Sequence, residues 1–308
     1  MVSTPGPAAV RSSRPQRSRQ RKNGLVAWLF ALPFVIIFGA FMLVPLLSSF
    51  VMSFTDFTSR DVQSPFAVAF TGLDQYTALF ADAQFRRSMI NTAYFVVVGI
   101  PLTMIVALAL AVALNSGITR FRTVFRTGFF TPVVTSIVAI AVVWRFILQD
   151  DGLINIVLGS IGVTGPNWLN DTAWAMPSMI LMAVWRNMGT LMIIFLAGLQ
   201  TISQEMLEAA EVDGANARQR FFSITLPALR PTLLLGGVLL SVGYLQFFEE
   251  PFVMTGGGPL DSTLSVSYFT YNEFGFGQYG QASAASYVLF VAIVILSLVQ
   301  FRALRSKD

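Results

Sequence analysis

The chain has 308 residues, of which 55% are hydrophobic and 12% are charged, and its formal net charge is +4. Because soluble domains are about 25% charged, this composition indicates that lipid is the main solvent of the chain. The chain has no cysteine and no histidine, which excludes disulfides, thiolate nucleophiles, His-ligated zinc and a Ser-His-Asp triad.

Residues 1–23 are rich in Ser, Pro and Arg and lack apolar periodicity, so they predict a disordered, basic cytoplasmic tail. A nucleic-acid-binding arm is the weaker alternative for such a segment. An apolar run then extends over residues 25–54. This run is longer than the roughly 7 to 15 residues of a cleavable signal's apolar core, and it predicts a retained first membrane span.

Five further apolar segments follow the first span. Each reaches the roughly 20 residues that a helix needs to cross about 30 Å of hydrocarbon. Helices are favoured because lipid offers backbone groups no water to bond. The sequence therefore predicts an all-α integral membrane protein, with six transmembrane helices in a domain of residues 24–308. The five segments are 93–114, 124–148, 176–199, 232–254 and 284–301.

The distribution of Lys and Arg predicts that both termini lie in the cytoplasm. Apart from the tail, basic residues gather in the second and fourth connections and at the C-terminus, which share one side if both termini do. These residues are Arg120, Arg122, Arg126, Arg218, Arg220, Arg230, Arg302, Arg305 and Lys307. The opposite side holds only Arg60, Arg86, Arg87 and, at most, Arg145.

A long connection, residues 201–231, joins the fourth and fifth spans on the predicted cytoplasmic side. Membrane hairpins need only a few residues, so the length of this segment indicates a function. Ser203 is placed to cap a helix, and Gly214 to end that helix in a left-handed turn. A second short helix follows until Pro227 and Pro231 break it. Periodicity alone fits an amphipathic connector on the headgroups as well as it fits a docking element.

The residue pattern of this connection resembles the EAA loop of binding-protein-dependent ABC importer permeases, with its fixed positions at the family's spacing. In that family the loop is the coupling helix, which sits in a cleft of the ATP-binding subunit, a form of helix-in-groove recognition. The resemblance implies that Glu208 meets the ATPase surface, that Ala209 and Ala210 permit close approach, and that Gly214 makes the bend. The full set of implied coupling residues is Glu208, Ala209, Ala210, Asp213, Gly214, Leu226 and Pro227.

The resemblance extends from about Leu25 to the C-terminus and is closest to the carbohydrate-uptake branch, the maltose permease group. It rests on short elements in order along the chain, which include 121–122, 131–132, 152–155, 196–200 and 252–259. Ser203 stands where the family often has proline. The resemblance implies a type I ABC importer permease fold in a bacterial plasma membrane, and a sugar as the solute. Polyols and glycerol phosphates are the alternatives within the same family.

Partners follow from the same resemblance. It implies a second homologous permease subunit, ATP-binding-cassette ATPase subunits and an extracytoplasmic solute-binding lipoprotein, all assembled in membrane lipid without nucleic acid. The only lysines, Lys22 and Lys307, do not follow a glycine, so the chain has no Gly-Lys-Ser/Thr phosphate-binding loop. ATP and Mg are therefore expected on the ATPase subunits, and this chain is expected to be non-catalytic and to bind no cofactor.

Polar groups at membrane depth are costly, which makes them candidates for a solute pathway or a buried pair. Arg186 is the clearest candidate, because it lies about 15 Å along the fourth span. Aromatic and hydrogen-bonding groups beside it and on the fifth span suit a sugar, and the resemblance points to the same spans. The predicted pathway residues are Arg186, Asn187, Thr190, Tyr244, Gln246, Phe247 and Glu249. Alternatively, Arg186 pairs with Glu249 or Glu250 and only pins the two spans together.

Two other classes of protein compete with an importer permease. A secondary transporter driven by an ion gradient predicts repeated halves, broken helices and midplane carboxylates, none of which the sequence indicates. A membrane enzyme is disfavoured by the missing histidine and cysteine and by the lack of clustered acids in the spans.

Overall fold

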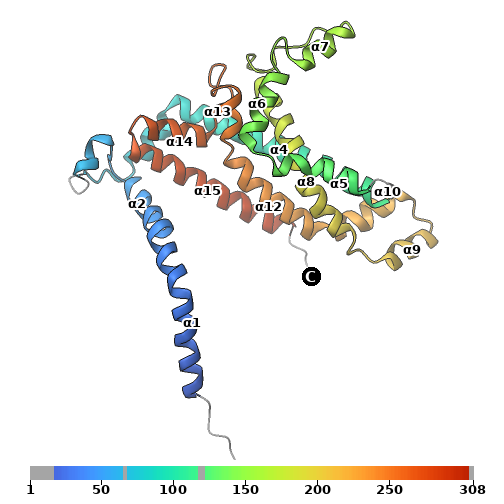
Figure 1. Ribbon diagram of the computed structural model, residues 1–308, viewed down its shortest axis with the longest axis horizontal. Helices are drawn as coiled ribbons and strands as arrows, with labels where there is room; N and C mark the ends of the chain where they lie inside the picture. Colours follow the sequence, from blue (N-terminus) through green and yellow to red (C-terminus); the bar gives the residue numbers. More distant parts are fainter. Residues whose placement is uncertain (1–16, 65–67, 117–121, 305–308) are drawn as a thin grey trace, which may run out of the picture. The chain divides into compact units, whose positions relative to one another are not determined.

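The computed structural model describes residues 17–64, 68–116 and 122–304 (Figure 1). Regular structure in these ranges is helical, apart from one isolated antiparallel bridge between Thr55 and Phe70. Four of the described helices are long and apolar enough to cross a membrane, and the number rises to six if each of two bent helix pairs forms one span. The architecture is all-α, as predicted.

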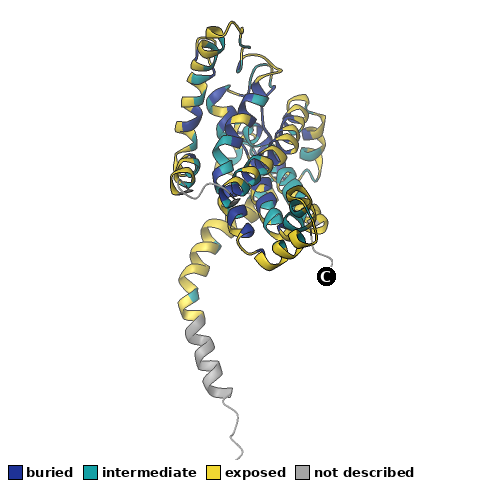
Figure 2. Cartoon of the chain, turned by 90° about the vertical axis from the view of Figure 1, so that its right-hand side faces the viewer, coloured by how far each residue is buried: buried dark blue, intermediate teal, exposed yellow. Residues whose placement is uncertain are grey.

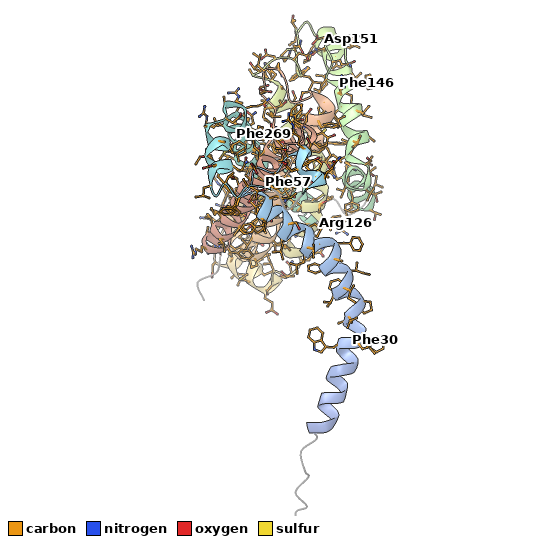
Figure 3. The ribbon with its side chains drawn as sticks, turned by 90° about the vertical axis from the view of Figure 1, so that its left-hand side faces the viewer. Phe30, Phe57, Arg126, Phe146, Asp151 and Phe269 are labelled. Carbon is orange, nitrogen blue, oxygen red and sulfur yellow. The ribbon has the colours of Figure 1, made fainter. Side chains whose placement is uncertain are left out.

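The chain divides into two compact units, Met1–Val51 and Met52–Asp308. The elements of the first unit are α1 (Arg17–Phe38), the π-helical turn η1 (Gly39–Leu43) and α2 (Val44–Met52). The predicted tail, residues 1–23, lies largely outside the described residues, and α1 already begins at Arg17. Large apolar side chains of this unit, among them Phe30, are exposed along the helix (Figures 2 and 3). Such a surface is typical of a helix that faces lipid or another protein.

A π-helical turn precedes a proline at two places in the chain. The first is η1, which is followed by Val44 and Pro45, and the second is η3 (Phe221–Thr225), which is followed by Leu226 and Pro227. In an α-helix the proline ring clashes with the carbonyl four residues earlier. Here that carbonyl lies within the wider π turn, which leaves room for the ring, so the helix continues beyond the proline. The prediction that Pro227 breaks the second short helix is therefore wrong.

Within the described residues, the second unit contains a short 3-10 helix and fourteen further elements. They are η2 (Ser59–Gln63), α3 (Asp74–Ala81), α4 (Ala83–Ser116), α5 (Arg122–Val134), α6 (Ile137–Ile147), α7 (Leu153–Ser160), α8 (Ala175–Leu199), α9 (Gln204–Val212), α10 (Ala217–Arg220), η3 (Phe221–Thr225), α11 (Leu226–Ala228), α12 (Arg230–Leu245), α13 (Glu249–Met254), α14 (Val266–Gly275) and α15 (Tyr279–Leu304).

Helix α8 lies at the centre of the second unit. It packs against α4, α5 and α12, and its apolar side chains meet those of α4 in a core that holds Phe95 and Phe195 fully buried. Figure 2 shows the buried residues gathered in this unit. A smaller core around Phe85 and Phe269 joins the start of α4 to α14 and α15, which lie side by side (Figure 1).

Two of the six predicted straight spans are broken. Residues 124–148 form α5 and α6, which meet at 101° across Thr135 and Ser136. The predicted span of 232–254 ends at Leu245, and α13 begins only at Glu249. A continuous helix would set the ring of Pro251 against the carbonyl four residues earlier, which favours a break at this place. A further bend of 65° separates Ala217–Ala228 from α12, and Pro231 lies at the start of α12.

Candidate functional site

The predicted coupling loop begins with a capped helix and a left-handed turn. The Ser203 side chain accepts a hydrogen bond from the backbone N–H of Met206 at the start of α9. At the other end, Gly214 has φ +83°, and the N–H groups of Gly214 and Ala215 bond to the carbonyls of Glu211 and Ala210. These are the two bonds of a Schellman motif. Both predicted features, the cap at Ser203 and the left-handed turn at Gly214, are confirmed.

The second arm of the loop starts with its own cap. Asn216 and Gln219 form a capping box, in which each side chain accepts from the other residue's backbone N–H. Arg220 of α10 forms an ion pair with Glu211 of α9. The two arms are therefore joined by the glycine turn and by a charge contact, so the loop is a defined helix–turn–helix element.

The predicted coupling residues differ in their exposure. Those of the first arm and the turn are exposed except Ala210, while Leu226 and Pro227 are half-buried. Glu208 lines a hollow of about 500 Å³ between the loop and the ends of α4 and α8. The tip of the loop therefore presents small, exposed side chains, which suits close contact with a partner surface.

Arg186 is the only charged residue of α8. Its side chain is half-buried, and its Nε atom is buried without a hydrogen-bond partner. Asn187 donates to the carbonyl of Ala183 at 2.9 Å, and Thr190 is half-buried one turn further on. Trp185 contacts Trp144 of α6, with ring centroids 5.6 Å apart. This part of α8 thus places polar groups and an indole at the edge of the core.

Tyr244 and Phe247 lie inside the core, where they have protein partners. The Thr103 hydroxyl donates to the carbonyl of Gly99 at 2.7 Å, which leaves its oxygen to accept from the Tyr244 hydroxyl at 2.8 Å. The Phe247 ring stacks on Phe95 at 4.0 Å. Tyr244 and Phe247 are 4% and 3% exposed, so a solute does not reach them in this state.

The remaining predicted pathway residues are not gathered around Arg186. Gln246 is exposed and lines a separate hollow of about 380 Å³ with residues of α14 and α15. Glu249 is half-buried at the start of α13, whereas its neighbour Glu250 is buried. Arg186 forms an ion pair with neither glutamate, because the only ion pair in the described part of the chain is Arg220–Glu211. The alternative in which Arg186 pairs with Glu249 or Glu250 to hold the two spans together is therefore not supported by an ion pair in this structure.

A polar hollow of about 460 Å³ lies between the end of α6 and the far end of α13. Its lining includes Arg145, which donates to the carbonyl of Val253 at 3.3 Å, and the carboxylates of Asp150 and Asp151. The side chain of Asp151 is labelled beyond α6 in Figure 3. Sequence reasoning did not single out this hollow, because its residues come from segments that are distant in the chain.

Comparison with known proteins places these features in a family. The model of the binding-protein-dependent transport system inner membrane component matches residues 24–306. The chain belongs to this family. It is therefore a multi-pass membrane permease of the ABC importer type, a non-catalytic class of subunit, and its fold is the type I fold. The bent helix pairs, which alone would also fit a secondary transporter, are in this chain features of an importer permease.

Two curated relatives match this permease over nearly its whole length. The lactose transport system permease protein LacF of Rhizobium radiobacter is 36% identical over 94% of this chain and 97% of its own. The trehalose/maltose transport system permease protein MalF of Thermococcus litoralis is 32% identical over 93% of this chain and 96% of its own.

Two solved structures have the same fold as this permease. A bacterial ABC transporter that imports the acidic polysaccharide alginate superposes with a TM-score of 0.75, at 25% identity, over 94% of this chain and 99% of its own. The alginate transporter in complex with its pentasaccharide-bound periplasmic protein superposes with a TM-score of 0.74, also at 25% identity, over 93% and 96%.

Proposed function

We propose that this chain is the permease subunit of an ATP-driven importer that carries a sugar across a bacterial plasma membrane. The observation that carries the proposal is the helix–turn–helix element of α9 and α10, in a chain that belongs to the importer permease family. The left-handed turn at Gly214 and the ion pair of Arg220 with Glu211 hold its two arms together. An element of this kind can transmit the motion of a bound partner without unfolding.

The motion would reach the membrane through the second arm. This arm continues through η3 and α11 to the 65° bend at Leu229, just before α12 begins at Arg230. At its other end α12 stops at Leu245, next to the aromatic residues Tyr244 and Phe247 and the glutamates of α13. A displacement of the coupling loop would therefore act on the segment of chain that lies beside Arg186.

Energy and solute would come from partner subunits. ATP and Mg would be bound by ATP-binding-cassette ATPase subunits, which supply phosphoryl-transfer chemistry. The chain's own residues Glu208 to Gly214 would contact the ATPase surface. A second permease would complete the pathway, and a solute-binding protein, as in the solved alginate complex, would deliver the solute. In the proposed orientation both termini and the coupling loop lie in the cytoplasm.

The proposed solute class is sugars. The relatives carry lactose and trehalose or maltose, and the solved structure imports alginate. In this chain, the donors Arg186 and Asn187 and the hydroxyl of Thr190 lie on the half-buried edge of α8 beside Trp185. Donors and acceptors next to an aromatic face suit a sugar, whose CH groups stack and whose hydroxyls need partners.

Substitution of Gly214 tests the proposal at the coupling loop. A β-branched residue is disfavoured in the left-handed region, whereas asparagine tolerates it. We expect Gly214→Val to reduce both co-isolation of the ATPase subunits and sugar-stimulated ATP hydrolysis, and Gly214→Asn to retain most of both. Equal, wild-type behaviour of the two variants would count against the proposal, as would a purified chain that never co-isolates with an ATPase.

A further inference from the structure

A half-buried arginine, Arg186, and a buried glutamate, Glu250, lie near each other without forming an ion pair. Glu250 is 5% exposed, and its Oε2 atom has no hydrogen-bond partner. Arg186 has a buried Nε atom that is equally without a partner. Helix α13, which carries Glu250, packs against α6, and Trp144 of α6 contacts Trp185, the residue before Arg186. The two groups are therefore close enough to interact electrostatically, but their charged atoms are more than 4 Å apart, since no ion pair joins them.

This arrangement is costly for a purely structural contact. A buried charge pair offsets its desolvation only when its geometry is good and its remaining hydrogen-bonding atoms are satisfied. Neither condition holds for Arg186 and Glu250. Buried polar atoms without a partner call for an explanation. Arg186 lies on α8, along which the proposed pathway runs, and Glu250 lies on α13, just beyond the end of α12.

We propose that Glu250 is a specificity-determining residue of the pathway, whose carboxylate offsets the charge of Arg186 so that the permease accepts neutral sugars and disfavours anionic ones. The proposal rests on the proposed function as a sugar importer. With both charges present, the net charge of Arg186 and Glu250 is zero. An anionic sugar that enters this segment must therefore lose its hydration without gaining a compensating positive charge. In a low-dielectric interior a charge acts over several ångströms, so selection does not require direct contact of the carboxylate with the solute.

Other charged groups near α13 leave this balance unchanged. Glu249 is half-buried next to Glu250. Arg145 packs against the same helix through its bond to the carbonyl of Val253. These two groups have opposite signs, so their contributions to the local charge largely cancel, and both are more accessible to water than Glu250. Glu250 is the one buried charged group among the four.

The test measures equilibrium binding of two radiolabelled probes to the purified permease–ATPase complex without its solute-binding protein, so that delivery does not influence selectivity. The neutral probe is whichever of lactose, maltose and arabinotriose the wild-type complex takes up fastest, and the acidic probe is digalacturonate. The readout is the ratio of the two affinities. We expect the wild type to favour the neutral probe, and Glu250→Gln to shift the ratio toward the acidic probe at least about tenfold, equal to about 1.4 kcal/mol.

Two further variants distinguish an effect of charge balance from a general loss of folding or binding. Arg186→Gln should shift the ratio in the opposite direction. The double variant Arg186→Gln/Glu250→Gln restores a sum of zero, and its ratio should return close to the wild-type value. Glu273→Gln, which removes a half-buried carboxylate on α14 away from the pathway, is the matched control and should leave the ratio unchanged.

The inference is overturned if the wild type prefers digalacturonate or binds neither probe, if Glu250→Gln leaves the ratio unchanged, or if the double variant stays as shifted as the single one. Should Glu250→Gln fail to assemble, the double variant and Arg186→Gln still decide the outcome. Failure of the proposed function is distinguishable, because in that case the complete wild-type complex, with its solute-binding protein, takes up no sugar at all.

Discussion

At the scale of single residues, the contact between Gly99 and Tyr244 explains why a tyrosine sits in the core. A Cβ atom on Gly99 would lie 2.9 Å from the Tyr244 ring, so glycine at this position lets the ring pack closely against α4. The hydroxyl then reaches Thr103 on the same helix at 2.8 Å. The pairing fixes the end of α12, because Tyr244 is the penultimate residue of that helix.

Gly99→Ala is expected to destabilise the purified protein by about 1 to 3 kcal/mol, because overpacking a closed contact forces ring and backbone to shift. The measurement is thermal unfolding in detergent. Gly243→Ala is the matched control, since a Cβ atom there meets nothing within 4 Å and alanine favours the helix. Its unfolding temperature should stay the same or rise slightly. An equal loss of stability in the two variants would show that the Gly99 contact does not matter.

At the scale of elements, α4 holds the connection between α13 and α14 through a side-chain clamp. The Asn91 amide donates to the carbonyls of Asp261 and Leu264 at 2.6 and 3.0 Å. On the next residue, the Thr92 hydroxyl accepts from the N–H of Val266 at 3.1 Å. Asn91 and Thr92 are both buried. The clamp therefore satisfies backbone groups that have little access to water.

Asn91→Ala should cost about 1 to 3 kcal/mol, because it removes the amide donor from the carbonyl of buried Leu264. The control is Gln84→Ala, which removes an exposed bond of 3.3 Å to the Asp261 side chain and should change stability by no more than about 0.5 kcal/mol. Limited proteolysis of the α13–α14 connection provides the measurement alongside thermal unfolding. Equal protection of the connection in Asn91→Ala and in the wild type would contradict the clamp.

The sequence was sufficient to predict those elements that are determined by neighbouring residues. Span positions follow from apolar length, the cap of α9 from Ser203, and its left-handed end from Gly214. The breaks within two predicted spans were missed, because a run such as 232–254 stays apolar on both sides of the break. Pro251 could have indicated the break near α13. Pro227, by contrast, led to a wrong prediction of a helix break, because a π turn accommodates its ring. Nothing in the sequence distinguishes the two prolines.

The candidate site was predictable only in part, for a related reason. Arg186 stands out in the sequence as a single charge in an apolar helix. The burial of Glu250 and the exposure of Gln246 depend on how α13 turns away from α12, which is a tertiary property. Thr103 was visible as a polar residue in the second span, but its partner Tyr244 lies on a different helix and could not be assigned from spacing.

At the scale of the whole molecule, the chain is a membrane subunit of a non-catalytic class. A conformational change is explained only if some ligand binds its two states with different affinity. In this chain the coupling loop is suited to bind a partner more tightly in one of the two states. The segment around Arg186 and Glu250 is suited to change its contact with the solute when the state changes. The family to which the chain belongs makes both assignments consistent.

The most direct test of this central claim is sugar uptake into proteoliposomes that contain the chain with its partner permease and ATPase subunits, with the solute-binding protein outside and nucleotide inside. Ionophores collapse all ion gradients, and uptake of lactose, maltose and arabinotriose is compared with ATP and with a non-hydrolysable analogue. We expect accumulation of at least one sugar with ATP and none with the analogue. Accumulation that is independent of ATP hydrolysis and disappears when ion gradients are collapsed would contradict it.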